Sequence, residues 1–79
     1  MKVCDAVVKR LRELADNKNI SLYKLQKTSG IPEGTFLSLM YGNRKGVNLT
    51  TLLQLIQTLG VSPKEFFDSP LFNEENLDI

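Results

Sequence analysis

Glycine and proline cut this chain of 79 residues into short segments, and within each segment the apolar residues recur every three or four positions. This spacing places them on one face of a helix. Gly30 is suited to a helix end because glycine adopts the left-handed conformation at little cost, and further segments stop at Gly42 and Gly60. We therefore predict five helices with apolar residues at Val3, Val7, Leu11 and Leu14, at Leu22 and Leu25, at Phe36, Leu39 and Met40, at Leu49, Leu52, Leu53, Ile56 and Leu59, and at Phe66 and Phe67.

The starts of these helices carry signals of their own. Ser21 and Asn48 are favoured N-cap residues, because their side-chain oxygens accept hydrogen bonds from the unpaired amides of a first turn. Pro32 suits the first turn of the third helix, and residues 62–65 (Ser-Pro-Lys-Glu) combine a capping box with an N-terminal proline. β-branched residues never alternate with period two, so we expect no β-sheet.

The composition limits how so short a chain is stabilised. Cys4 is the only cysteine and histidine is absent, which excludes an intramolecular disulfide and a zinc site built from Cys and His. A lone thiol fits a reducing cytoplasm, no apolar run approaches the ~20 residues of a membrane span, and the N-terminus lacks the apolar core of a signal peptide. We expect one cytoplasmic, all-α domain with a compact core, and no metal, cofactor or small-molecule ligand.

Charge is unevenly distributed, although the net charge is only +1. Residues 1–67 carry ten Lys and Arg against five Asp and Glu, a net of +5, whereas residues 68–79 carry four acidic residues and no basic one. A basic body suits a polyanionic partner, and the alternative is that the charges only solvate the surface. The acidic tail over residues 69–79 is expected either to be disordered or to cover apolar surface, on this subunit or a second one, with Leu71, Phe72, Leu77 and Ile79.

The most informative stretch runs from Ser21 to Tyr41. It contains two short predicted helices joined by the tight turn Ser29-Gly-Ile-Pro32. This is the layout of a helix-turn-helix, whose second helix enters the major groove of DNA. The apolar residues that would pack the two helices together are Leu25, Ile31, Phe36 and Leu39.

The sequence here resembles the phage-repressor and Cro-like (XRE) family of transcriptional regulators. The resemblance covers about residues 8–68 and is carried by Ser21-Leu-Tyr-Lys-Leu25, Ser29-Gly-Ile-Pro32, Thr35-Phe36, Gly42, Leu49-Thr-Thr-Leu-Leu-Gln-Leu55, Leu59-Gly-Val-Ser-Pro63 and Phe66-Phe67. It implies a five-helix lambda-repressor-like DNA-binding domain over residues 1–68, with a recognition helix at about residues 33–41. The base-facing positions that it implies are Glu33, Gly34, Leu37 and Ser38, and the implied phosphate-facing positions are Asn43, Arg44, Lys45 and Asn48.

The implied base-facing residues differ in how they could recognise a base, and for some of them another interpretation is open. Glu33 could accept a hydrogen bond from cytosine N4, or it only favours the positive end of its helix dipole. Leu37 could contact a thymine methyl group, or it lies in the core or in a dimer contact. Ser38 can donate or accept and discriminates weakly, and Gly34 permits close approach of the backbone.

Cations near the predicted helix-turn-helix are candidates for phosphate contacts. Lys24 and Lys27 are expected to be exposed on the first of its two helices, and residues 43–45 form a cationic loop whose alternative interpretation is a solvated turn. The sequence departs from the family at three places. Met40 stands where many relatives have a glutamate that pairs with an arginine of the first helix, here Arg12, so that ion pair is absent. Leu22 stands where relatives often have a phosphate-binding glutamine, and Gln26 stands where relatives usually have a small residue.

We predict a sequence-specific transcriptional regulator, a repressor, that binds double-stranded DNA as a homodimer. The alternative is a protein-interaction module that retains the fold without DNA binding, because several residues make the expected DNA face more apolar and less basic: Leu22, Glu33, Leu37 and Met40. An enzyme is not expected, since the chain has no histidine, one cysteine and no evident carboxylate pair.

Overall fold

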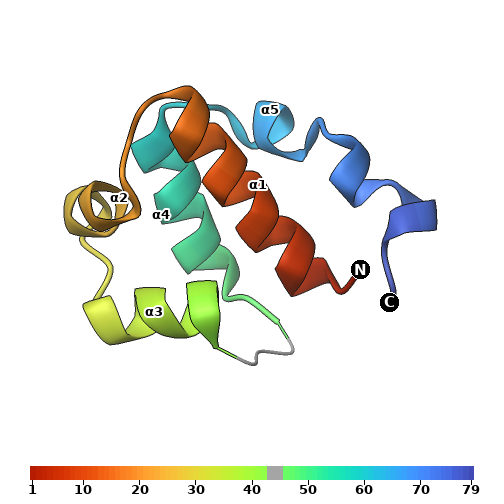
Figure 1. Cartoon of the computed structure of the whole chain (residues 1–79), viewed down its shortest axis with the longest axis horizontal. Helices are drawn as coiled ribbons and strands as arrows, with labels where there is room; N and C mark the ends of the chain where they lie inside the picture. The colour runs from red at the N-terminus through yellow and green to blue at the C-terminus, as the bar shows by residue number, and fades with distance from the viewer. Residues whose placement is uncertain (43–45) are drawn as a thin grey trace.

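The computed structural model describes residues 1–42 and 46–79. Its five α-helices are followed by two short 3-10 turns: α1 (Val3–Asn17), α2 (Leu22–Ser29), α3 (Glu33–Tyr41), α4 (Leu49–Leu59), α5 (Pro63–Phe67), η1 (Pro70–Phe72) and η2 (Glu74–Asn76). In Figure 1, α1 and α4 lie side by side, α2 lies at their left and α3 runs across their lower end. The described residues contain no strand, only an isolated bridge between Lys2 and Asp78, so the all-α prediction is confirmed.

The helices begin where the capping residues were predicted. The side chains of Ser21, Asn48 and Ser62 accept hydrogen bonds from the backbone amides three residues later, at 3.0–3.1 Å. Gly30 ends α2 with φ of 76°. Gly42 ends α3 for a different reason, because its φ is −80° and a Cβ atom there would collide with the backbone oxygen of Ser38.

The core is shared by all five helices. α4 packs against both α1 and α2, and Leu25, Phe36 and Phe66 belong to the buried core between the helices. The side chains most completely buried are Phe66, Leu11, Leu25, Leu55, Ile56, Leu59 and Val7.

Three of the predicted apolar positions are exposed instead. Val3 and Leu49 are the first residues of their helices, where a side chain leans toward the helix N-terminus and so extends past its neighbours. Phe67 is 43% exposed, although its ring packs edge-on against Phe66 and Phe72 with centroids 5.0 Å away from each.

The acidic tail folds back along α1 and brings the two termini together (Figure 1). Leu71, Phe72 and Leu77 are half-buried, so the tail covers surface of its own chain, whereas Ile79 is fully exposed. The N-terminal amino group pairs with Asp78 at 3.0 Å. The predicted boundary after residue 68 stays a prediction.

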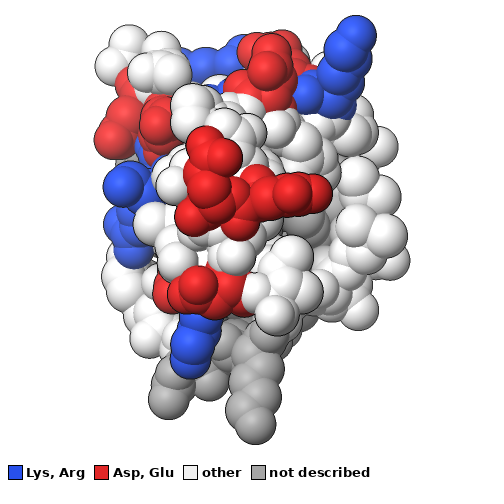
Figure 2. All heavy atoms as spheres, turned by 90° about the vertical axis from the view of Figure 1, so that its right-hand side faces the viewer, with Lys and Arg blue, Asp and Glu red and all other residues white. Residues whose placement is uncertain are grey.

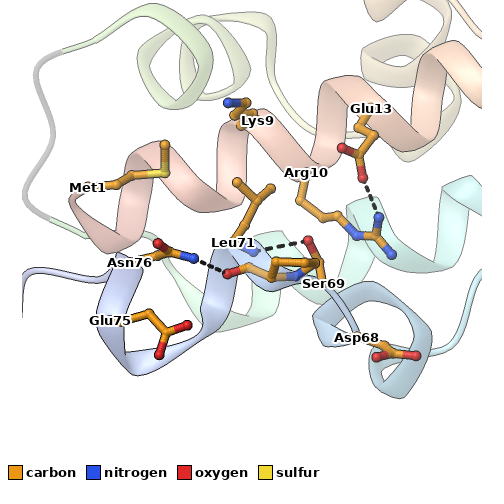
Figure 3. A pocket seen from close by; sticks show the side chains of 10 residues that line it. Met1, Lys9, Arg10, Glu13, Asp68, Ser69, Leu71, Glu75 and Asn76 are labelled. Atoms are coloured by element: carbon orange, nitrogen blue, oxygen red, sulfur yellow. Dashed lines mark hydrogen bonds and ion pairs between the residues drawn. The ribbon is translucent and has the colours of Figure 1, made fainter.

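Arg10 connects α1 to α5, and Figure 3 shows its guanidinium paired with Glu13. Its Nε donates to the Phe66 carbonyl and its Nη2 to the Glu65 carbonyl, both at 2.8 Å, while Nη1 pairs with Glu13. These carbonyls belong to the last turn of α5, where the Glu65 carbonyl also accepts from the Asp68 amide at 3.3 Å and the Phe66 carbonyl lies past the last helical donor. Arg10 therefore acts as a C-terminal cap for α5.

None of the helices in the described ranges combines the length and the apolar character that crossing a lipid bilayer requires.

Candidate nucleic-acid interface

A tight turn fixes the angle between α2 and α3. Its left-handed residue is Gly30, and Ser29 accepts a hydrogen bond from the Ile31 amide at 3.3 Å. Gln26 is buried, and its Nε2 donates to the Ile31 carbonyl at 2.6 Å. The long side chain therefore fits between the helices by bonding to the turn itself.

In the sequence, Gln26 stands out only as a departure from the family. Its role in the turn was missed, although the pattern contained a signal. A polar side chain on the buried side of a helix needs a hydrogen-bond partner, and the nearest unpaired backbone groups belong to the turn that follows.

The two sides of α3 differ sharply. Phe36, Leu39 and Met40 face the core and are at most 6% exposed. The opposite side is exposed and includes all four predicted base-facing residues: Glu33, Gly34, Leu37 and Ser38. Leu37 is 44% exposed, which excludes the interpretation that it belongs to the core.

Tyr41 also lies on the exposed side of α3, where it is 64% exposed. The guanidinium of Arg12, in α1, lies 5.1 Å from the centre of its ring. Tyr23 on α2 is arranged in the same way, with Lys27 Nζ 5.5 Å from its ring centre. Tyr23 was not predicted to belong to the site, although its four-residue spacing from Lys27 places both residues on one helix face.

An apolar hollow of about 200 Å³ lies between α2 and α3. The side chains that line it are Leu22, Tyr23, Gln26, Glu33, Phe36, Leu37 and Tyr41. The departure at Leu22 thus makes the junction of the two helices more apolar, and the base-facing Leu37 forms one wall.

The structure describes three of the six residues that were predicted to contact phosphate. Lys24 and Lys27 are exposed on α2. Asn48 is exposed at the start of α4, and its Oδ1 accepts from the Thr51 amide, which leaves the side-chain NH₂ to donate elsewhere. Asn43, Arg44 and Lys45 lie outside the described residues.

The surface carries a charge gradient from the tail to the helix-turn-helix. Figure 2 shows the side of the molecule that lies at the right of Figure 1, where acidic side chains spread across the tail. The acidic residues of positions 68–79 are all exposed: Asp68, Glu74, Glu75 and Asp78. In Figure 1, α2 and α3 lie at the other side, so a polyanion meets them with the least repulsion.

Comparisons with known proteins agree with this geometry. The family model described as "Cro/C1-type HTH DNA-binding domain" matches residues 10–70. A solved structure, titled "Crystal structure of the prophage Lp1 protein 11", shares 31% sequence identity with a TM-score of 0.82, and the alignment covers 94% of this chain and 99% of that one. No curated protein gives a significant match.

Proposed function

The chain belongs to the family of Cro/C1-type helix-turn-helix DNA-binding domains, and from this premise we propose that it is a sequence-specific transcriptional regulator, a repressor. It binds double-stranded DNA by inserting α3 into the major groove. The observation that carries the proposal is the exposed side of α3, on which Glu33, Gly34, Leu37 and Ser38 lie together. A helix held by one buried side leaves the other free to enter a groove about 12 Å wide.

Base readout then divides among these four residues. The hydroxyl of Ser38 donates to or accepts from base edges, and Leu37 contacts the methyl group of thymine. Gly34 lets the helix backbone approach the bases closely, because nothing projects from it. Glu33 accepts from cytosine N4, and its carboxylate disfavours other bases in the same place.

Phosphate contacts set the register on the duplex. Lys24 and Lys27 are exposed on α2, and the NH₂ group of Asn48 is available at the start of α4. The sequence adds Asn43, Arg44 and Lys45 to this set. Each phosphate that a cation neutralises contributes about −0.9 to the slope of log affinity against log salt.

A homodimer is part of the proposal. A single domain of this size buries too little surface for tight specific binding, and two-fold symmetry doubles the contacts on half-sites spaced by about 34–36 Å. The proposed location is the cytoplasm.

One observation favours a second candidate, a protein-interaction module with the same fold. The hollow between α2 and α3 is lined mainly by apolar side chains, and its rim includes Tyr23 and Tyr41, which are 71% and 64% exposed. Exposed aromatic residues are enriched where proteins bind other proteins. This candidate predicts no binding to duplex DNA.

The test begins with selection of bound duplexes from a random pool, followed by fluorescence anisotropy on the selected site and on a scrambled one. The proposal expects salt-dependent binding to both, with tighter binding to the selected site. Replacing Ser38 by alanine should change the ratio between the sites, whereas Lys24→Gln should weaken binding to both sites equally. Absence of binding at low salt would contradict the proposal and favour the interaction module.

A further inference from the structure

A row of charged residues follows one side of α1 toward the end of α3. Lys2, Asp5, Lys9 and Arg12 follow one another at intervals of three or four residues, and therefore share a helix face. Together they line a hollow of about 290 Å³, whose other wall includes Leu39, Met40 and Gly42. Three cations and one carboxylate leave this hollow with a surplus of positive charge beside the predicted recognition helix.

Arg12 differs from its neighbour Arg10 in what its guanidinium contacts. Arg10 donates to two carbonyls and pairs with Glu13. Between described residues the ion pairs are Met1–Asp78 and Arg10–Glu13, and Arg12 belongs to neither. It lies over the Tyr41 ring at 5.1 Å, a contact with the ring face that uses no N–H donor.

Tyr41 connects this row to the helix that reads DNA. It is three residues after Ser38 and lies on the same exposed side of α3. A planar guanidinium stacked on a ring is held in place with its edge facing outward, and this edge suits the oxygens of a phosphate.

We infer that Arg12, Lys9 and Lys2 form a phosphodiester-binding row on α1, which grips the DNA strand beside the C-terminal end of α3. The inference rests on the proposed function and deepens it. The row extends over about 15 Å, at about 1.5 Å per residue, which is too long for a single phosphate and lets the three cations contact successive phosphates of one strand. Tyr41 is a positioning residue that holds Arg12, and Asp5 weakens the row by repelling the strand.

The test is a salt titration of duplex binding, from about 50 to about 200 mM, with the full chain. Arg12→Gln and Lys9→Gln should each reduce the salt slope by about 0.9, so that this increase in salt weakens the wild type about 3.5-fold more than either variant. Asp5→Asn should bind more tightly than the wild type. Lys64→Gln, which removes an exposed cation on α5, should leave the slope unchanged.

Tyr41 provides a second readout with a matched pair of variants. Tyr41→Phe keeps the ring face and should retain the wild-type affinity, whereas Tyr41→Ala releases Arg12 and should weaken binding severalfold. Adding Arg12→Gln to Tyr41→Ala should then cost less than Arg12→Gln costs alone.

These measurements distinguish a failure of the phosphate-binding row from a failure of the proposed function. If the wild type binds duplex DNA with a salt-dependent affinity while Arg12→Gln and Lys9→Gln keep its slope, the row on α1 is wrong and the proposed function stands. If the wild type shows no salt-dependent binding to duplex DNA, the proposed function fails and the inference fails with it. Lys9 is exposed, so its variant reports on the row even if Arg12→Gln disturbs folding.

Discussion

The tail side and the α3 side of this molecule use cationic side chains in opposite ways. On the tail side, Arg10 bonds to the carbonyls of Glu65 and Phe66, and the N-terminal amino group pairs with Asp78. On the α3 side, Lys27 and Arg12 lie over the rings of Tyr23 and Tyr41. A cation bonded to oxygen atoms stabilises the fold, whereas one resting on a ring keeps its donors for a ligand.

The two sides also differ in the sign of their charge. The last twelve residues carry four acidic groups and no basic one, and the first 67 carry a net charge of +5. Such a gradient turns the molecule as it approaches a polyanion, since the acidic tail is repelled and the helix-turn-helix is attracted. A net charge of +1 for the whole chain therefore conceals the separation of charge that bears on binding.

The largest effect should come from Arg10→Met, which keeps the apolar stem and removes the guanidinium. The Phe66 carbonyl and Glu13 lose their donor and the Glu65 carbonyl keeps only the Asp68 amide, so we expect the free energy of unfolding to fall by about 2–3 kcal/mol in urea denaturation. Arg12→Met should cost less than about 1 kcal/mol, because only a contact with a ring is lost. Equal losses of stability for the two substitutions would contradict the distinction between a structural Arg10 and an Arg12 whose donors are free for a ligand.

A smaller effect, on binding rather than stability, should follow from the double variant Lys24→Gln/Lys27→Gln. Two phosphate contacts are lost, so the salt slope should fall by about 1.8. The stability of the domain should change little, since both side chains are exposed. Anisotropy titrations measure the slope and thermal melts measure the stability; an unchanged slope would remove α2 from the interface.

Gln26→Met tests whether the hydrogen bond from Gln26 to the turn fixes the angle of α3. The substitution keeps the volume but removes the donor to the Ile31 carbonyl, and we expect a loss of about 1 kcal/mol of stability. The affinity for DNA should fall as well, because α3 is no longer held at its angle. A stable variant with full affinity would show that the hydrogen bond is dispensable.

The smallest effect is expected at the termini. Asp78→Asn removes the partner of the N-terminal amino group, a pair whose carboxylate side chain is 81% exposed. Exposed pairs contribute about 0–1 kcal/mol, so the unfolding midpoint should shift by no more than a few degrees. A larger shift would mean that the tail contributes to stability through its ends as well as through Phe72.

Most of the fold could be predicted from sequence because its signals are local. Ser21, Asn48 and Ser62 cap helices by bonding three residues ahead, and Gly30 supplies a conformation that few other residues adopt. The hydrophobic spacing likewise located the five helices. The exposed position of Leu49 was missed, because the spacing identifies a helix face but not where neighbouring helices end.

The candidate site could be predicted only in part. The exposed side of α3 follows from its buried one, so Glu33, Leu37 and Ser38 were located correctly on the surface. The contact between Arg12 and Tyr41 joins residues 29 positions apart in different helices, and no local pattern predicts which ring a cation will cover. The packing of helices that are distant in the sequence decides which ring Arg12 covers, and this packing is known only from the three-dimensional structure.

An NMR titration of the labelled protein with a selected DNA site tests whether the exposed side of α3 meets the duplex. We expect the largest chemical-shift changes at the amides of residues 33–41, smaller ones along α2 and the Arg12 side of α1, and none in the tail. Changes concentrated in residues 68–79, or none anywhere at saturating DNA, would contradict the account.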